Sequence, residues 1–402
     1  RPLAFQEAKF DSFNFLTLFG RKNWFAAKAK GRDAFFNLRG KWEERGGTRV
    51  LELGQGQFRS PLLRVALGAP VRFEITADTV FLSGNDVYLG KEGMLKSFRG
   101  FFRRNREEVS LEVEARDFDL SYLRRLLKAR TPLEGNADFR LTLKGALSDP
   151  YVIIDARMER PIFGDFAFDS LELKGRYGSG ALVLSTLKIY EAGRPSWAYA
   201  EVPALLSLSP LHFEVLDSGD IRSGAYTEGI DPTPFLKHLG NFLVVDGGTL
   251  SLNIKVEGDV KNPVFAGNFS LKAREGTITS INSYLSDIYA RGHFDGETVY
   301  FDTITGLSEK GRLLGFGRLK MKGLAADSLD LTFRTRKIPV SFGPDMNGVA
   351  SGTVTLRGPL PRFWIIGDIY LDEFAFFAPF GRRGGGGGPS PSPVRYRLRI
   401  KA

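Results

Sequence analysis

Few residues in this 402-residue chain have the types and spacing that catalysis requires. Asp117 and Asp119, in RDFDLS, are two closely spaced carboxylates of the kind used in general acid–base chemistry. Asp119 also directly precedes an amphipathic stretch, where it fits the N-cap of a helix better. The three histidines, His212, His238 and His293, are far apart in sequence, and we interpret His238 as solvated. We therefore predict no catalytic dyad here.

Sequence patterns of known catalytic sites are also absent. The chain contains no His-x-Glu-x-x-His, no Gly-x-Ser-x-Gly, no P-loop and no dinucleotide-binding glycine pattern. The run GRRGGGGGPSPSP at 381–393 resembles an anion nest but lacks a following helix. Five consecutive glycines oppose a packed structure through their backbone entropy, so we predict a mobile loop. We expect a non-enzymatic protein without cofactor or metal.

A basic and aromatic stretch, FRGFFRRNR at 98–106, has three interpretations. It is a solvated basic loop, a contact for anionic lipid headgroups at a groove rim or membrane surface, or a nucleic-acid site. We prefer the first, keep the second and predict no nucleic-acid partner. The candidate headgroup contacts are Arg99, Arg103, Arg104 and Arg106.

The composition allows a large apolar surface. Hydrophobic residues make up 43% of the chain, with 34 Phe against 4 Trp and with 46 Gly, and the formal net charge is +10. The chain has no cysteine, which excludes a disulfide scaffold. No apolar run approaches the roughly 20 residues of a membrane span. Because the chain starts on Arg1 and stops inside the alternating VRYRLRIKA, we interpret it as part of a longer protein whose membrane anchor would lie outside it.

Apolar and polar residues alternate along most of the chain. In ADFRLTLK, at 137–144, the apolar residues occupy every second position, and VSLEVEA, TLSLNIKVE, FSLKA, SLDLTFR and TVTLR follow the same pattern. A period of two is typical of strands with one wet and one dry face. Such strands are mainly paired in an antiparallel sense. We predict an all-β fold.

The strands belong to a repeat. GNADFRLTLKGALSDP at 135–150, GTLSLNIKVEGDVKNP at 248–263 and GVASGTVTLRGPLP at 348–361 each start on a glycine, reach a second glycine ten positions later and then a proline. A hairpin-like stretch at 171–187 resembles another at 288–304. The repeat is therefore a module of several strands.

The sequence predicts helices at two places. The stretch 119–130 is amphipathic, and 231–240 has Thr233 as N-cap, Pro234 at the first helical position and Gly240 as a stop. Residues 280–292 also have helical spacing, but the hairpin correspondence favours a strand in their second half. Two or three short helices cannot cover so many dry strand faces. Those faces either meet in a filled sandwich or β-helix, or line a curled trough, and alternation does not distinguish the two.

The repeated element resembles that of the TamB family, within the wider AsmA-like group. Its pattern is a small-residue start, an alternating strand ending in Leu-x-Gly, a turn ending in Asp/Asn-Pro and another strand. Leu143, Gly145 and Pro150 match it, as do the equivalent residues around Gly258 and Pro263. The element at 348–361 departs from it, because its turn is two residues shorter. The resemblance covers about residues 110–402.

The resemblance implies a long curled antiparallel-rich sheet, a β-taco, built from modules of about 100 residues. Its ranges would be 1–118, 119–230, 231–340 and 341–402. It also implies a periplasmic protein anchored in the inner membrane and a β-groove that carries phospholipid acyl chains between membranes. The implied partners are phospholipids and an Omp85-type outer-membrane barrel resembling TamA. The groove would be lined by Phe139, Leu141, Leu143, Leu250, Leu252, Ile254, Val256, Phe269, Leu271, Leu331, Phe333, Val354 and Leu356.

Two other functions remain open. One is a scaffold for outer-membrane protein assembly, in which strand edges pair with a nascent chain. The other is a carbohydrate-active β-helix, which requires carboxylates and aromatic residues gathered on one outer face. The sequence does not reveal such a cluster, so lipid transfer is the first hypothesis and the scaffold the second.

Overall fold

The computed structural model describes residues 12–18, 23–31, 34–60, 64–90, 93–127, 131–236, 243–279, 282–309, 311–341, 346–376 and 395–401. The chain divides into two compact units. Unit 1 consists of Arg1–Gly193 and Tyr199–Leu216, and unit 2 of Arg194–Ala198 and Asp217–Ala402. The finer division at 118, 230 and 340 stays a prediction.

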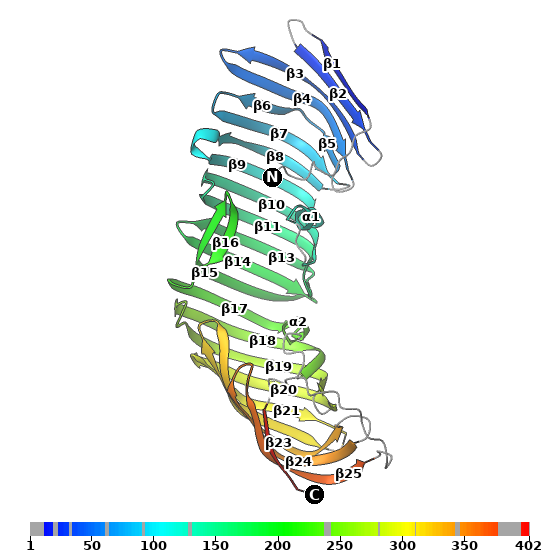
Figure 1. Cartoon of the computed structure of the whole chain (residues 1–402), viewed down its shortest axis with the longest axis vertical. Coiled ribbons are helices and arrows are strands. Elements are labelled where there is room, and N and C mark those ends of the chain that lie inside the picture. The colour runs from blue at the N-terminus through cyan, green and yellow to red at the C-terminus, as the bar shows by residue number, and fades with distance from the viewer. Residues whose placement is uncertain are drawn as a thin grey trace, which may run out of the picture. The chain divides into compact units, whose positions relative to one another are not determined.

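Unit 1 is built on one antiparallel sheet (Figure 1). Its strands are β1 (Ser12–Leu18), β2 (Asn23–Lys30), β3 (Phe35–Arg45), β4 (Thr48–Arg59), β5 (Arg64–Leu67), β6 (Val71–Ile75), β7 (Thr79–Leu89), β8 (Gly93–Arg103), β9 (Glu108–Asp119), β10 (Leu133–Ala146), β11 (Asp149–Phe163), β12 (Phe166–Ala167), β13 (Ser170–Gly178) and β14 (Ala181–Glu191). Most pair with their neighbours along the chain. The exceptions are β5 and β6, which both lie between β4 and β7, and β13, which pairs with β11 beyond β12. The strand β15 (Arg194–Leu208), whose residues Arg194–Ala198 belong to unit 2, pairs with β16 (Leu211–Val215) in a hairpin and also with β17 (Asp220–Ile230).

Unit 2 is likewise a sheet of successive hairpins. Its strands are β17 (Asp220–Ile230), β18 (Leu243–Asp259), β19 (Val264–Ile278), β20 (Ser283–Gly296), β21 (Thr298–Leu307), β22 (Arg312–Lys322), β23 (Ala325–Ser341), β24 (Met346–Pro359), β25 (Trp364–Phe376) and β26 (Arg395–Lys401). Pairing is antiparallel from β17 to β25 and parallel between β25 and β26. The predicted fold class, an all-β chain with a long, mostly antiparallel curled sheet and short helices, is confirmed.

The repeated glycine–proline elements form tight turns. Gly145 lies opposite Pro150 at the β10–β11 turn, and Gly258 precedes the β18–β19 turn that holds Pro263. The two glycines have φ values of 101° and 99°, which side-chain-bearing residues rarely adopt. Both prolines are fully buried. The repeat therefore encodes a strand, its turn and the buried start of the next strand.

Both predicted helices exist but are shorter than expected. The first is α1 (Ser121–Leu127), and Asp119 accepts a hydrogen bond of 2.8 Å from the Ser121 amide, which supports its predicted capping role. The second is α2 (Thr233–Leu236), where the prediction was wrong in detail. Asp231, not Thr233, caps it: its carboxylate accepts bonds from the Thr233 amide at 2.9 Å and from the Thr233 hydroxyl at 2.7 Å.

The remaining local predictions have mixed outcomes. Residues 283–296 form strand β20, so the strand reading of this region is confirmed, and the two hairpins at 171–187 and 288–304 exist. The predicted helix stop at Gly240 and the loop at 381–393 lie outside the described residues. Of the helices in the described ranges, none has the length and apolar character needed to span a membrane.

Candidate functional site

The predicted groove residues all lie on the apolar faces of the two sheets. In unit 1, Phe139, Leu141 and Leu143 lie on β10 opposite Ala115, Val113 and Leu111 of β9. In unit 2, the β18 residues Leu250, Leu252, Ile254 and Val256 share a face with Phe269 and Leu271 of β19, and the β23 residues Leu331 and Phe333 pair with Leu356 and Val354 of β24. The sequence therefore assigned these side chains to the correct face.

Rows of apolar residues cross the sheet of unit 2 perpendicular to its strands. One row runs through direct register partners in the order Leu252, Phe269, Gly292, Phe301, Gly317, Leu331 and Leu356. Large and small residues alternate in the middle of this row. The two groups of predicted residues, on β18–β19 and on β23–β24, are thus joined into one continuous surface.

The middle strands of this surface are absent from the predicted set. Gly292 and Phe294 on β20, Phe301 on β21 and Gly317 on β22 complete the apolar rows. Their signal was present in the sequence, because Ala290, Gly292 and Phe294 alternate with polar residues. We did not include these strands because glycine is not counted as a hydrophobic residue, so a face made partly of glycine does not show the apolar alternation.

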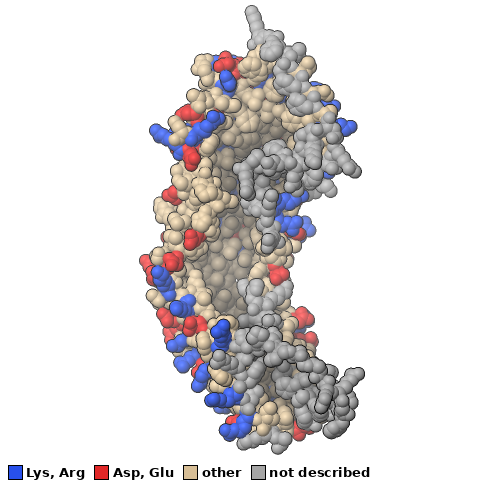
Figure 2. Space-filling model, in the orientation of Figure 1, with Lys and Arg blue, Asp and Glu red and all other residues tan. Residues whose placement is uncertain are grey.

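The predicted residues are only partly covered. Val256 and Leu356 are buried, each with 7% of its surface exposed, whereas all the others are half-buried. A closed core buries its leucines and phenylalanines almost completely. Figure 2 shows the visible face of unit 1 hollowed and free of charged side chains over much of its area, with charges gathered toward its edges. The apolar face is therefore accessible along a large part of the strands.

At one end of the strands, in contrast, buried side chains cover the apolar face. In unit 2, Leu285 and Ile288 of β20 pack with Ile338 and Val340 of β23, although two strands separate these elements in the sheet. In unit 1, Phe118, Leu120 and Ala137 form a smaller cluster beside α1. Helix α2 contacts β18 and α1 contacts β10, at this same end of their strands. The helices therefore mark the closed margin of each apolar face.

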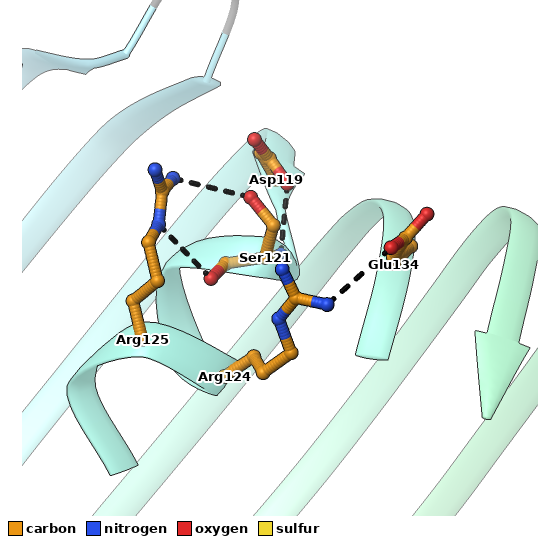
Figure 3. A network of polar contacts seen from close by, with 5 residues as sticks. All are labelled: Asp119, Ser121, Arg124, Arg125 and Glu134. Carbon is orange, nitrogen blue, oxygen red and sulfur yellow. Dashed lines mark hydrogen bonds and ion pairs between the residues drawn. The ribbon is translucent and has the colours of Figure 1, made fainter. Parts of the chain in front are cut away.

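A small polar network holds α1 at that margin (Figure 3). Arg125 bonds back to Ser121, with 3.1 Å from Nη2 to the hydroxyl oxygen, and its guanidinium lies 4.4 Å from the centre of the Tyr122 ring. Arg124 reaches Glu134 on β10 at 3.5 Å. Both cations are thus used locally, and the network orients the helix without forming a binding pocket.

The outer face of unit 1 is stabilised by cross-strand ion pairs. Glu112 lies 2.7 Å from Arg99 and 3.4 Å from Lys144, and the hydrogen bonds from Arg99 and Lys144 lower its pKa below the ordinary value. Glu114 pairs with Lys96 at 3.0 Å, and that hydrogen bond lowers the pKa of its carboxyl group. These exposed pairs alternate along the strands with the apolar residues, so the sheet has one charged face and one apolar face.

The four arginines of the basic stretch have different environments. Arg99 and Arg103 project from β8 and pair with Glu112 and with Glu108, the latter at 2.6 Å. Arg104 and Arg106 lie exposed in the 3-10 turn Arg104–Arg106, and neither has an acidic partner within the described ranges. Only the second pair is available for an anionic headgroup. Phe98 and Phe102 of the same stretch face the apolar side, whereas Phe101 is on the outer side.

The residues considered for catalysis are not assembled into a site. The carboxylate of Asp119 caps α1, and the backbone amide of Asp117 donates a hydrogen bond of 2.8 Å to the Asp138 carboxylate. His212 pairs with Glu214 and His293 with Asp302, in different units, and His238 lies outside the described residues. Across the described ranges, no group of histidine, aspartate and glutamate side chains could hold a metal ion.

Comparison of the chain with protein-family models, with curated proteins and with solved structures gave no match. The assignment of a function therefore depends on the residues and their arrangement.

Proposed function

We propose that this chain is a non-enzymatic lipid-transfer segment of a TamB-like envelope protein, in which the apolar face of each unit receives phospholipid acyl chains. The observation that carries this proposal is the partial exposure of the apolar face. Leu141, Leu252 and Phe333, for example, are half-buried although they lie in unbroken apolar rows. A protein without an apolar ligand gains stability by covering such rows.

The energetics of lipid movement favour such a surface. An acyl chain in water costs about 0.8 kcal/mol per CH₂, so a sixteen-carbon tail would face on the order of 12 kcal/mol. An apolar row removes much of that cost while the headgroup stays hydrated. The sheet needs no catalytic residue for this task, only continuous alternation of apolar and polar side chains.

A pair of charge substitutions in unit 2 tests the proposal. Leu252→Asp changes a half-buried residue of the open rows, and Ile338→Asp changes a residue that is 2% exposed in the filled margin. We expect Leu252→Asp to abolish crosslinking to a photoactivatable phospholipid while shifting Tm little. Ile338→Asp should unfold unit 2, because a buried unpaired charge is not tolerated.

The opposite pattern would refute lipid transfer. If Leu252→Asp lowers Tm as much as Ile338→Asp, the face is a core. If it folds and still crosslinks lipid as the wild type does, the lipid lies elsewhere. Native mass spectrometry of the purified wild-type chain provides an independent measurement, since co-purified phospholipid is expected.

The location and partners belong to the same proposal. We place the protein in the periplasm, with an inner-membrane anchor outside this chain and an Omp85-type barrel as its outer-membrane partner. Support comes from the TamB-like repeat around Gly145, Pro150, Gly258 and Pro263. Fractionation of cells expressing the full-length protein, followed by crosslinking to the barrel, tests both statements.

A second candidate function, a scaffold for a nascent β-strand, is favoured by the β15–β16 hairpin. All five residues of β16 are exposed, including Leu211 at 68% and Phe213 at 54%. On the other side of β15, the amides of Ala204 and Leu208 donate to the carbonyl oxygens of Gly180 and Leu147, and the Leu206 amide donates to the Tyr177 hydroxyl. The strand β16 is therefore the outer edge of the hairpin. An open edge with apolar side chains is suited to strand addition. A photocrosslinker at Phe213 would capture polypeptide under this hypothesis and lipid or nothing under the first.

A further inference from the structure

A row of uncharged polar and aromatic side chains crosses the outer face of unit 2. It takes one residue from each of six neighbouring strands: Trp197, Tyr226, Asn253, Asn268, His293 and Tyr300. Direct register pairs connect the row from Tyr226 to Tyr300. Trp197 joins it through ring stacking on Tyr226, with 5.6 Å between ring centres. Residues directly opposite one another share a face, so all six project away from the apolar rows.

The neutrality of this row sets it apart from its surroundings. Elsewhere the outer face of unit 2 carries ion pairs such as Arg222 with Glu257, 3.6 Å apart, and Arg357 with Asp330, 3.1 Å apart. The six residues of the row carry no formal charge at pH 7. The neutral stretch ends at Tyr300, because Arg318 lies opposite it on β22. Within the stretch an anionic ligand would find no cation, and a purely apolar ligand would have to desolvate the amides. The fitting ligand is therefore neutral, polar and elongated.

Two aromatic pairs bracket the amides. At one end Trp197 is 47% exposed, and the hydroxyl of Tyr226 donates to Glu228, which fixes the second ring. At the other end the rings of His293 and Tyr300 are stacked, with centres 4.9 Å apart and planes 14° apart. Aromatic faces attract positively polarised hydrogens, such as the C–H groups of a pyranose ring.

The side chains between the aromatic pairs supply hydrogen bonds. The amides of Asn253 and Asn268 are exposed, and each offers both donors and an acceptor. The Nδ1 atom of His293 lies 3.0 Å from an Asp302 carboxylate oxygen, so a neutral ring that donates there presents Nε2 as an acceptor. These groups match the hydroxyl and acetamido groups of sugars.

We propose that this row binds an extended, uncharged glycan chain of β-linked sugars. Neighbouring strands lie about 4.8 Å apart, so about 14 Å separate the strands of Tyr226 and His293. One pyranose unit of an extended chain is about as long as one strand spacing, so about three sugars would span the section from Tyr226 to His293 and about five would span the whole row from Trp197 to Tyr300. The inference does not depend on lipid transfer, because the row lies on the opposite face from the groove.

Titration of the full chain with two soluble hexasaccharides, cellohexaose and N-acetylated chitohexaose, tests this site. Isothermal calorimetry should detect binding of at least one of them to the wild type. Trp197→Ala and Asn268→Ala should each weaken that binding at least tenfold, and Trp197→Phe should retain most of it. Trp24→Ala is the matched control, since Trp24 is an exposed tryptophan in unit 1, 52% exposed.

Two results would overturn the proposal. One is the absence of binding of either sugar to the wild type at millimolar concentration. The other is binding that the Trp24 variant weakens as much as the Trp197 and Asn268 variants do. Should Trp197→Ala fold poorly, Asn268→Ala still decides the matter, because Asn268 is exposed and its removal leaves the apolar rows intact. Failure of this test leaves lipid crosslinking unaffected.

Discussion

The ring of Phe269 occupies the space beside Gly292, its partner on the neighbouring strand. A Cβ atom at position 292 would come within 2.6 Å of Phe269 Cζ. Phe333 has the same relation to Gly315, at 2.6 Å, in unit 2. In each pair the glycine gives the ring space to lie along the sheet instead of standing up from it. At both positions the missing side chain therefore leaves room for a phenylalanine ring close to the sheet.

This arrangement predicts that alanine at position 292 destabilises unit 2. The added Cβ would meet both the Phe269 ring and the Tyr300 carbonyl oxygen, the latter at 2.0 Å. Overpacking of this kind costs about 1–3 kcal/mol, which lowers Tm by at least about 2 °C in a domain of this size. Thermal unfolding of Gly292→Ala followed by circular dichroism measures the effect.

Gly175 provides the matched control. It occupies the equivalent position of the earlier hairpin, but the nearest atom to an added Cβ there is 3.3 Å away. Gly175→Ala should therefore leave Tm unchanged or raise it slightly, because alanine reduces the entropy of the unfolded chain. Equal losses for the two variants would mean that the ring–glycine contact is not the cause.

A second prediction concerns a buried hydroxyl group. Ser283, at the start of β20, has no exposed surface, and its Oγ has no hydrogen-bond partner within the described residues. A buried unpaired hydroxyl costs free energy, so Ser283→Ala should keep or raise Tm. Ser283→Val, which adds volume at the same site, should lower it. A clear fall for the alanine variant would show that the hydroxyl is bonded in solution.

A third prediction concerns pH. Arg99 and Lys144 lower the pKa of Glu112 below its ordinary 4.5, so the folded state favours the ionised carboxylate. This contribution is present above pH about 4.5 and disappears as the pH falls through the lowered folded pKa. Glu112→Gln should therefore have a lower Tm than the wild type at pH 7 and the same Tm at pH 2. Added salt should shrink the difference at pH 7.

Glu201 supplies the comparison for that experiment. It is an exposed glutamate of unit 1 with no ion pair within the described ranges. Glu201→Gln should leave Tm unchanged at both pH values. A difference between Glu112→Gln and the wild type that persists at pH 2 would point to lost packing instead of lost charge.

Much of the strand pattern was predictable, because it depends on local alternation. Leu141, Leu252 and Val354 were assigned to the apolar face from their positions in period-two stretches, and the structure places them there. The turns were predictable for a similar reason, since Gly145 and Gly258 mark positions where the chain needs a positive φ. Capping was less certain: Asp231 and Thr233 are both good N-cap residues, and spacing did not select between them.

The outer row of unit 2 could not be predicted, because it depends on register between strands. His293 lies opposite Tyr300 because the short β20–β21 turn sets the register of the first pairs, before a bulge between Arg291 and Gly292 shifts the pairs beyond it. Asn253 and Asn268 meet through the length of the β18–β19 turn. Alternation identifies the face on which a side chain lies but not its neighbour across the sheet. The sequence also does not reveal how completely the side chains cover the apolar face, because this depends on where rings such as that of Phe269 lie.

The last prediction separates the four arginines of the basic stretch, and it depends on the proposed lipid function. Arg104 and Arg106 lack acidic partners within the described ranges, whereas Arg99 and Arg103 are paired. Basic residues near an anionic membrane contribute about 1 kcal/mol each, so the double substitution R104Q/R106Q should weaken binding to phosphatidylglycerol-containing vesicles by about tenfold to thirtyfold. The control R99Q/R103Q should weaken it much less, because Glu112 and Glu108 already neutralise those charges. Cosedimentation with anionic and with neutral vesicles measures both. If the wild type does not bind anionic vesicles, or if the two double variants bind them equally well, the turn is only a solvated basic loop.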